Sequence, residues 1–410
     1  MAQRGDRYDL CFFSPGWCTV PLLAGRADDM SVGGAEVQVT RVGAALARRG
    51  LRVSFVVLDV PEARGLPAPE PAIGLFTAYQ PGRGLPVFRY FLHTVPRLWG
   101  ALRNANAAAY YVRGAGGLAG VIALFCRRSG AKFIFAVAND HDLDADPVLG
   151  RRDRLLFRLA RRRADAIVVQ TRAQAERLES LGLRGVLIPS ACEIPEQVGS
   201  DLGNPTVLWA GRGRSVKRPE LFVELARRLP EVRFTMALGE MLGDEALYRK
   251  VRAEALALPN VEFVGEVPFE EMPAMYARTW VLVNTSESEG FPNTFLEAWA
   301  REIPVVAAVD TDGLLSKGGL GFYCTSVDEM AEAVRRLWRD TALRSMMGRR
   351  GRDYVVARHS VEAATDRYLD LLAILGVVNG RAVGARPTCA GVALQGHPEG
   401  APQGRRGAKR

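Results

Sequence analysis

Long apolar runs and paired cysteines are both missing from this sequence of 410 residues. The longest apolar stretch, near Gly117–Cys126, has ten residues, whereas a helix that crosses a bilayer needs about 20. The polar first residues contain no signal-peptide core. The six cysteines are scattered and none is spaced as C-x-x-C, so we expect reduced, buried thiols. These absences predict a cytoplasmic protein that meets a membrane, if at all, only from the surface.

Two common nucleotide-binding motifs and a calcium loop are absent too. No G-K-[ST] follows a glycine-rich turn, and no G-x-G-x-x-G is followed by an acidic ribose ligand, so we expect neither a P-loop enzyme nor a nicotinamide dehydrogenase. Asp140, Asp142 and Asp144 alternate as in a calcium loop. Such a loop also needs Gly at its sixth position and Glu at its twelfth, where Ala145 and Arg151 stand. We therefore expect no metal site.

Charge is present but unevenly placed. The net charge is +9 overall, with +8 in residues 1–200, −4 in 201–376 and +5 in 377–410. A basic first half suits an anionic substrate or an anionic membrane surface. A general preference for arginine in the source genome explains the same numbers, and both explanations stay open. We expect no nucleic-acid binding, since only net charge and the last residues would support it.

Short β-rich runs alternate with helical patterns along the chain, which predicts parallel sheets with helices on both faces. The predicted strands lie at 8–14, 53–59, 74–79, 108–112, 133–138, 166–170, 186–189, 207–210, 233–238, 261–264, 280–284 and 305–309. The predicted helices lie at 35–49, 117–128, 151–163, 172–181, 219–229, 244–256, 269–277, 293–301, 327–338 and 361–375. We expect an α/β fold with two Rossmann-like units facing each other across a cleft. The predicted parts are an acceptor-binding domain over 1–198 and a donor-binding domain over 199–360. A helix over 361–376 would return to the first domain, and 377–410, rich in Gly, Pro, Ala and Arg, would be a disordered basic tail.

The segment Thr285–Ala300, TSESEGFPNTFLEAWA, holds the most chemistry. A strand ends before it, and Asn293 or Thr294 can cap a helix whose free N–H groups suit a phosphate. Glu289 and Glu297 flank that site, and carboxylates there suit the hydroxyls of a sugar and a ribose. From spacing alone, two exposed charges that stabilise a helix N-terminus explain the pattern equally well.

The pattern S-x-x-E-G-F-x-x-x-x-L-E-A, followed by PVVA, resembles the signature of glycosyltransferase family 4. The resemblance implies the GT-B fold and retaining, metal-independent transfer from a UDP- or GDP-sugar. It also implies that Glu289 contacts the donor hexose and Glu297 the ribose. The intervening contacts to sugar and diphosphate would come from Gly290, Phe291, Asn293 and Thr294.

Three further segments fit this resemblance. In VLWAGRGRSVK, Arg212 and Lys217 would neutralise the diphosphate, although a solvated basic turn is the alternative. In SVGGAE, Gly33 and Gly34 would lie beside the donor phosphate and the acceptor. In FVGEV, which contains Gly265, backbone groups would receive the base.

The family's cleft histidine has no clear counterpart. The matching positions are Ala138 and Asn139, while His141 comes two or three residues late. Either His141 is brought in by a different turn, or Asn139 or Asp140 takes its place; we name Asn139 and His141 as candidates. Arg113 could bind an anionic acceptor or phosphate, or be a surface residue. The basic helix Arg151–Arg163 could lie on anionic lipid or simply have a solvated face.

The sequence thus predicts a retaining hexosyltransferase that uses a nucleotide sugar as cosubstrate and has no other cofactor. Its acceptor would be a glycan, a lipid-linked molecule or a small molecule, with cell-surface glycan or polysaccharide synthesis the favoured setting. A nucleotide-sugar epimerase or hydrolase on the same scaffold is one alternative. An inactive nucleotide-sugar-binding protein is another.

Overall fold

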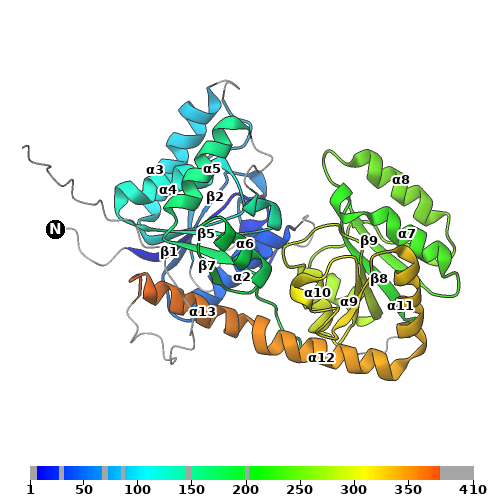
Figure 1. Cartoon of the computed structure of the whole chain (residues 1–410). Coiled ribbons are helices and arrows are strands. Elements are labelled where there is room, and N and C mark those ends of the chain that lie inside the picture. The colour runs from blue at the N-terminus through cyan, green and yellow to red at the C-terminus, as the bar shows by residue number, and fades with distance from the viewer. Residues whose placement is uncertain are drawn as a thin grey trace, which may run out of the picture.

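The computed structural model describes residues 7–26, 32–66, 73–84, 88–144, 150–196, 198 and 203–378. These residues form two parallel sheets, each with helices on both faces (Figure 1). We call the seven-stranded sheet and its helices the N-terminal unit, and the six-stranded sheet and its helices the C-terminal unit. The predicted α/β architecture is confirmed.

The N-terminal sheet has the order β3-β2-β1-β4-β5-β6-β7, and each neighbouring pair is parallel. Its strands are β1 (Tyr8–Ser14), β2 (Val53–Val57), β3 (Gly74–Thr77), β4 (Ala107–Arg113), β5 (Lys132–Ala136), β6 (Ala166–Val169) and β7 (Gly185–Leu187). Its helices are α1 (Thr19–Leu23), α2 (Gly34–Arg48), η1 (Pro61–Ala63), η2 (Arg89–Thr94), α3 (Val95–Ala105), α4 (Gly117–Ser129), η3 (Asp140–Leu143), α5 (Arg151–Arg163) and α6 (Arg172–Ser180).

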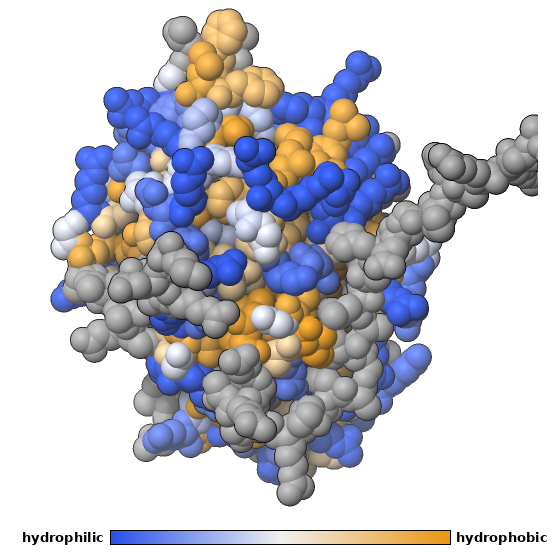
Figure 2. All heavy atoms as spheres, turned by 90° about the vertical axis from the view of Figure 1, so that its left-hand side faces the viewer, coloured by the Kyte–Doolittle hydropathy of each residue, from blue (hydrophilic) through white to orange (hydrophobic). Residues whose placement is uncertain are grey.

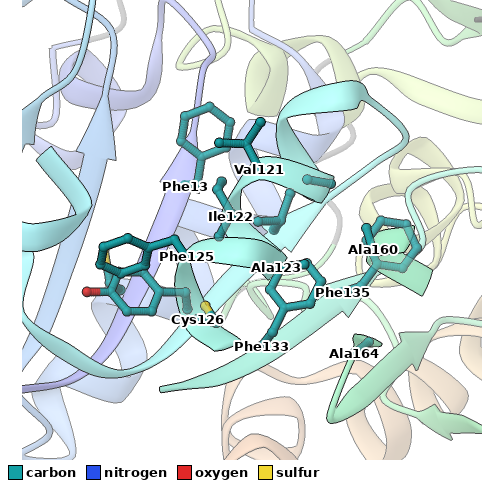
Figure 3. Packing of buried hydrophobic residues seen from close by; sticks show 14 of the residues in the cluster. Phe13, Val121, Ile122, Ala123, Phe125, Cys126, Phe133, Phe135, Ala160 and Ala164 are labelled. Atoms are coloured by element: carbon teal, nitrogen blue, oxygen red, sulfur yellow. The ribbon is translucent and has the colours of Figure 1, made fainter. Parts of the chain in front are cut away.

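The core of the N-terminal unit lies on both faces of its sheet. All five residues of β2 are buried, as expected for a central parallel strand. On one face, α3, α4 and α5 pack over β4 and β5, where Phe133 and Phe135 meet Ile122 and Phe125 of α4 (Figure 3). On the other face, α2 and a helix from the end of the chain cover the same strands.

The C-terminal sheet has the order β10-β9-β8-β11-β12-β13, again parallel throughout. Its strands are β8 (Thr206–Arg212), β9 (Phe234–Gly239), β10 (Val261–Phe263), β11 (Thr279–Asn284), β12 (Val305–Ala307) and β13 (Gly321–Tyr323). Its helices are η4 (Ser215–Lys217), α7 (Pro219–Arg228), α8 (Glu245–Leu256), α9 (Met272–Ala277), α10 (Asn293–Trp299), η5 (Thr311–Gly313), α11 (Val327–Arg339) and α12 (Thr341–His359).

The last helix, α13 (Val361–Ile374), lies against α2 of the N-terminal unit. Figure 1 shows α12 and α13 running beneath both units. Val377 and Val378 contact the same core as α13, so ordered packing extends into the segment where the sequence predicted a tail. Residues 379–410 lie outside the described part of the chain. No helix among the described residues is long and apolar enough to cross a membrane.

Two long helices, α3 and α12, were not predicted from the sequence. In α12 the signal is weakened by Gly348 and Gly351, which read as helix breakers. The structure gives a packing reason for both. A Cβ at Gly348 would lie 1.9 Å from the Glu302 carbonyl oxygen, and one at Gly351 would lie 2.5 Å from the Trp299 ring. The glycines therefore allow α12 to approach α10 closely.

Candidate active site

A cavity of about 530 Å³ lies between the two units. It is lined by residues that follow the carboxyl ends of β1, β4 and β5 on one side and of β8 and β11 on the other. Ligands bind at this edge of parallel sheets because strand ends and helix starts meet there. The lining includes most residues that the sequence singled out: Gly33, Gly34, Asn139, Arg212, Lys217, Glu289, Gly290, Phe291, Asn293, Thr294 and Glu297.

The centre of the C-terminal wall is an ion pair between Lys217 and Glu289. The Lys217 ammonium donates to Glu289 Oε1, and Ser286 Oγ donates to the same oxygen at 2.7 Å. The Glu289 side chain is only 13% exposed, so this charge is held mostly out of water. The structure thus pairs a lysine that the sequence assigned to the diphosphate with a glutamate that it assigned to the donor hexose.

The loops that carry this pair are fastened to each other. Thr285 Oγ1 donates to the Lys217 carbonyl oxygen at 2.7 Å and accepts from Trp209 Nε1 at 3.0 Å. Arg218 Nε donates to the Thr285 carbonyl oxygen at 2.9 Å. Arg218 has a φ of +45°, an unusual value for a residue other than glycine. These contacts fix the turn after β8 against the turn after β11, and so fix Lys217 relative to Glu289.

Glu297 lies deeper, on α10. Tyr276 of α9 donates its hydroxyl to Glu297 Oε2 at 2.7 Å, which leaves Oε1 without a hydrogen bond to the described residues. Burial raises the pKa of the Glu297 carboxyl above its usual value, and the Tyr276 hydrogen bond offsets part of that rise. The free oxygen is an acceptor that suits a hydroxyl donor.

In the N-terminal wall, the acidic run is used for structure. Asp142 accepts from the backbone N–H groups of Ala138 at 2.7 Å and Asn139 at 3.2 Å, and it fixes that loop at the cavity. Burial raises the pKa of the Asp142 carboxyl, and the backbone donors oppose the rise. Asp140 accepts from Gln174 Nε2 at 2.8 Å. Within the described residues, no group of three or more His, Cys, Asp or Glu side chains could hold a metal ion.

Two candidates do not line the cavity. The His141 side chain is 69% exposed, and its Nδ1 lies 3.2 Å from Asp144 Oδ2, so Asn139 and not His141 occupies the cleft position. The one-turn η3 helix turns the His141 ring away. Gly265 also lies outside the lining, with a φ of +69°, while the next residues, Glu266 and Val267, are part of it.

Arg113 is a cavity residue rather than a surface one. It stands at the end of β4 and lines the cavity, and its Nε is buried without a hydrogen-bond partner among the described residues. A buried, unpaired guanidinium nitrogen is costly, so a ligand that accepts from it would be favoured. This cation faces the cavity from the N-terminal unit.

Two family models together match most of the chain. Residues 191–354 match the group 1 glycosyl transferases, and residues 32–192 match Glycosyltransferase Family 4. The chain belongs to the group 1/family 4 glycosyltransferases. The family membership predicted from the paired glutamates is confirmed.

Curated relatives share less than a third of their residues with this chain over the aligned regions. The chain is 28% identical over 228 residues to the lipopolysaccharide core biosynthesis glycosyltransferase LpsE of Rhizobium meliloti (strain 1021), which covers 52% of this chain and 65% of that protein. It is 29% identical over 194 residues to the alpha-D-kanosaminyltransferase of Streptomyces kanamyceticus, covering 45% and 49% respectively. The matched region therefore spans less than two-thirds of each relative.

Solved structures share the fold. Sucrose-phosphate synthase from Thermosynechococcus elongatus superposes with a TM-score of 0.71 at 18% identity, covering 90% of this chain and 98% of that one. Anabaena Alr3699/HepE, solved in complex with UDP and glucose, superposes with a TM-score of 0.70 at 16% identity, covering 89% and 99%. The predicted GT-B arrangement is confirmed.

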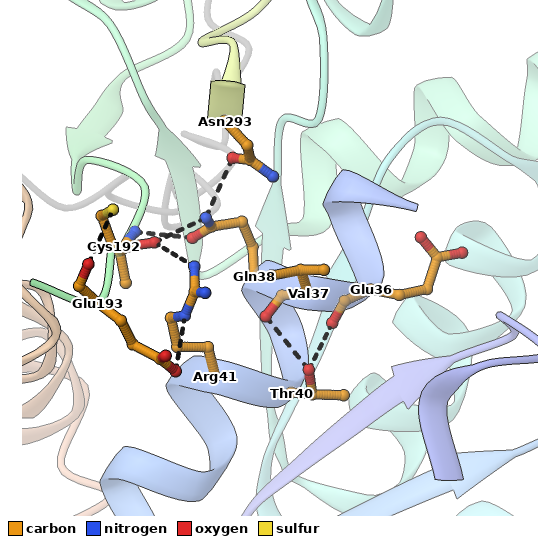
Figure 4. Close-up of polar contacts among 9 residues, drawn as sticks. Glu36, Val37, Gln38, Thr40, Arg41, Cys192, Glu193 and Asn293 are labelled. Atoms are coloured by element: carbon orange, nitrogen blue, oxygen red, sulfur yellow. Dashed lines mark hydrogen bonds and ion pairs between the residues drawn. The ribbon is translucent and has the colours of Figure 1, made fainter. Parts of the chain in front are cut away.

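The hydrogen bonds that join the two units were not predicted from the sequence. Gln38 Nε2 donates to Asn293 Oδ1 at 3.1 Å and to the Ala191 carbonyl oxygen at 2.8 Å (Figure 4). Asn293 Nδ2 in turn donates to the Gly34 carbonyl oxygen at 3.1 Å. A Cβ at Gly290 would lie 2.8 Å from the Ala138 carbonyl oxygen, so glycine permits the close approach. The signal in the sequence that could have pointed to Gln38 is a polar side chain on the mainly apolar face of α2.

Proposed function

We propose that this chain transfers a hexosyl group from a UDP- or GDP-sugar to an acceptor hydroxyl with retention of anomeric configuration. The observation that carries the proposal is the Lys217–Glu289 pair, held on two fastened loops inside the inter-unit cavity. The nucleotide sugar is a cosubstrate, and the proposal includes no resident cofactor.

The cations of the cavity suit a leaving nucleoside diphosphate. Arg212, Arg214 and Lys217 all line the C-terminal wall. As the glycosidic bond breaks, negative charge develops on the diphosphate, and fixed cations in a water-poor cleft stabilise it. We propose that these side chains supply that charge compensation without a metal ion.

Glu289 fits a binding role better than a nucleophilic one. Its Oε1 already accepts from Lys217 and Ser286, which withdraws negative charge from the carboxylate. We therefore propose that Glu289 orients the hydroxyls of the donor hexose while the acceptor attacks the face that the diphosphate leaves. The departing diphosphate would take the acceptor's proton. Glu297 would bind the ribose through its free oxygen.

The proposal for the acceptor rests on the names of relatives and on one cation in the N-terminal wall. LpsE is named for lipopolysaccharide core biosynthesis, and the predicted setting of cell-surface glycan synthesis agrees with that name. Arg113, in the N-terminal wall with its unpaired Nε, suits an anionic acceptor or the donor phosphate. We propose that the N-terminal wall binds the acceptor.

Nucleotide-dependent thermal unfolding in EDTA tests the proposal. UDP, GDP and ADP are added to the wild type and to Glu297→Ala at about 100 times the dissociation constant, where binding adds about 2.7 kcal/mol. We expect one nucleotide to raise the wild-type unfolding midpoint and the variant to respond less.

Incubation with the matching sugar donors then distinguishes a transferase from an epimerase or hydrolase. Product that forms only with an acceptor supports transfer, whereas rapid turnover without an acceptor indicates an epimerase or hydrolase. No nucleotide response would overturn the proposal.

A further inference from the structure

A second cavity, of about 410 Å³, opens on the N-terminal unit away from the active site. Arg7, just before β1, and Ala107, the first residue of β4, both line it. The strands of this sheet are parallel, so this cavity lies at their amino ends, whereas the active-site cavity lies at their carboxyl ends. We call it the edge cavity. Its volume is typical of a site for a small molecule.

Three arginines line the edge cavity. Besides Arg7, these are Arg103 in the last turn of α3 and Arg128 in the last turn of α4. All three are exposed, and Arg7 Nη2 donates to the Ala107 carbonyl oxygen at 3.2 Å. Arg103 and Arg128 form no hydrogen bond or ion pair with any residue that the structure describes. Their guanidinium donors are therefore available to a ligand.

Acidic side chains do not balance these charges. The part of the lining that the structure describes has no Asp or Glu, and residues 71–139 contain none but eight Lys and Arg. Near the same edge of the sheet, Asp9 accepts from the Arg52 N–H at 2.8 Å, and Asp165 accepts from Lys132 Nζ at 3.0 Å. The ends of α3 and α4 contribute about half a negative charge each, less than the three whole positive charges. The edge cavity is therefore electropositive.

Aromatic rings form a fixed part of the lining. Trp99 of α3 meets Phe125 of α4 edge to face at 5.1 Å, and Tyr110 of β4 meets the same Phe125 ring at 5.3 Å. The Tyr110 hydroxyl donates to the Leu102 carbonyl oxygen at 2.7 Å and accepts from the Ala107 N–H at 3.0 Å. Figure 2 faces the side of the unit where β1 begins, and hydrophilic side chains project there beside apolar surface. The partly exposed Trp99 thus offers a held apolar surface beside the arginines.

We propose that the edge cavity binds a small organic phosphate with at least two negative charges and a sugar or base ring. Guanidinium groups bind phosphate oxygens through paired N–H donors, and three of them around one cavity suit a multiply charged group. The ring of the ligand packs against Trp99, as flat rings do on aromatic surfaces. One cavity of this volume holds one small molecule, whereas a nucleic-acid chain follows a long groove.

The edge cavity is separate from the donor site, although one strand reaches both. Ala107 begins β4 at the edge cavity, and Arg113 ends β4 at the active-site cavity. A strand of this length spans about 20 Å. A phosphate in the edge cavity therefore leaves the donor site open, and the proposed binding does not rest on the proposed glycosyl transfer.

Calorimetric titration of the full chain tests the binding. The probes are inorganic pyrophosphate, glucose 6-phosphate and ATP. We expect at least one probe to bind the wild type, and Arg103→Ala with Arg128→Ala to weaken that binding about tenfold or more. These side chains are exposed, so the double variant should keep the wild-type unfolding midpoint. Trp99→Leu should weaken binding of glucose 6-phosphate and ATP more than binding of pyrophosphate, which has no ring.

The matched control is Arg97→Ala with Arg127→Ala. It removes the same charge from exposed positions of the same two helices, outside the lining of the edge cavity. We expect it to change the dissociation constant by less than about twofold, since only long-range charge is lost and salt screens it. Equal weakening by the control and by Arg103→Ala with Arg128→Ala would indicate a diffuse basic surface and overturn the proposal.

Other results overturn the proposal as well. One is that none of the three probes binds the wild type. Another is probe binding that survives loss of Arg103 and Arg128 but disappears in Lys217→Ala, because that binding belongs to the active site. Phosphatidylglycerol vesicles and a nucleic-acid polymer are titrated in parallel, and binding of either without binding of the soluble probes assigns the arginines to another class of partner. Calorimetry of these probes measures no turnover, so failure of the edge cavity and failure of the proposed transferase activity are distinguishable.

Discussion

Glu289 and Glu297 lie in one cavity, yet their surroundings prepare them for different tasks. Glu289 is paired with Lys217 and accepts from Ser286, so its charge is compensated on the spot. Glu297 accepts a hydrogen bond from the Tyr276 hydroxyl, and burial raises its pKa. Removing Glu289 should therefore affect the charge balance around Lys217, whereas removing Glu297 should affect nucleotide binding and the pH dependence of stability.

Lys217→Ala should lower kcat roughly 10²–10³-fold, because one fixed positive group that stabilises developing charge is lost. Steady-state kinetics with the donor identified by thermal unfolding measure this. Lys250→Ala, on the exposed side of α8, is the matched charge control. A Lys217→Ala protein that folds and keeps wild-type kcat would remove this lysine from the reaction.

Glu297→Gln should raise stability at pH 8 while it weakens nucleotide binding. Because the folded pKa of Glu297 is raised above the ordinary 4.5, the native state keeps a proton that the unfolded chain releases. Wild-type stability from this group is therefore complete below 4.5 and falls as pH rises through the folded pKa. Glutamine does not titrate. Urea unfolding at pH 4.5 and pH 8 checks this, and an equal wild-type-to-variant difference at both pH values would contradict it.

At the scale of elements, periodicity predicted the strands well but not all the helices. β1, β2 and β11 are short, buried and rich in β-branched or aromatic residues, so the sequence marks them clearly. The two glutamates were located because their motif is local to one strand, turn and helix. The α12 helix was missed because its glycines are explained only by distant neighbours on α10.

Gly348→Ala and Gly351→Ala should each destabilise the protein by about 1–3 kcal/mol, since a Cβ would meet the Glu302 backbone or the Trp299 ring. Helix propensity alone gives the opposite sign. Gly100→Ala in α3 is the control: its Cβ would meet nothing within 4 Å, so a gain of about 0.5–1 kcal/mol is expected. Chemical denaturation measures all three, and a stabilised Gly348→Ala protein would show that α12 is not held so closely.

Across the whole molecule, the units meet through a few polar contacts and one crossing point. Asp312 of the C-terminal unit accepts from the backbone N–H groups of Arg172 at 2.9 Å and Ala173 at 3.2 Å, at the start of α6. At the crossing point, Cys192 pairs with Ser360 in a single parallel bridge. His359 is 1% exposed there, and its Nδ1 lies 2.9 Å from the Ser190 carbonyl oxygen. None of these long-range partners can be read from local sequence.

His359 should make stability fall in acid. Burial lowers the pKa of His359 from 6.5 to about 4, so the native state keeps it neutral while the unfolded chain takes up a proton. Its contribution is complete above pH 6.5 and is lost as pH falls towards 4, by about 3 kcal/mol in all. His359→Gln should flatten the stability profile between these pH values relative to the wild type. Parallel profiles from urea unfolding would refute this.

The placement of α13 has a consequence for folding during synthesis on the ribosome. Tyr368, Leu369 and Leu372 belong to a core that combines side chains of α13 and its flanking residues with side chains from residues 10–191. Domains fold during synthesis as soon as their parts have emerged. The C-terminal sheet, whose strands are contiguous in the chain, can therefore finish folding first, although it is synthesised after the strands of the N-terminal sheet. Until α13 leaves the exit tunnel, the earlier unit carries an uncovered apolar face, and chaperones that hold nascent chains have their natural target there.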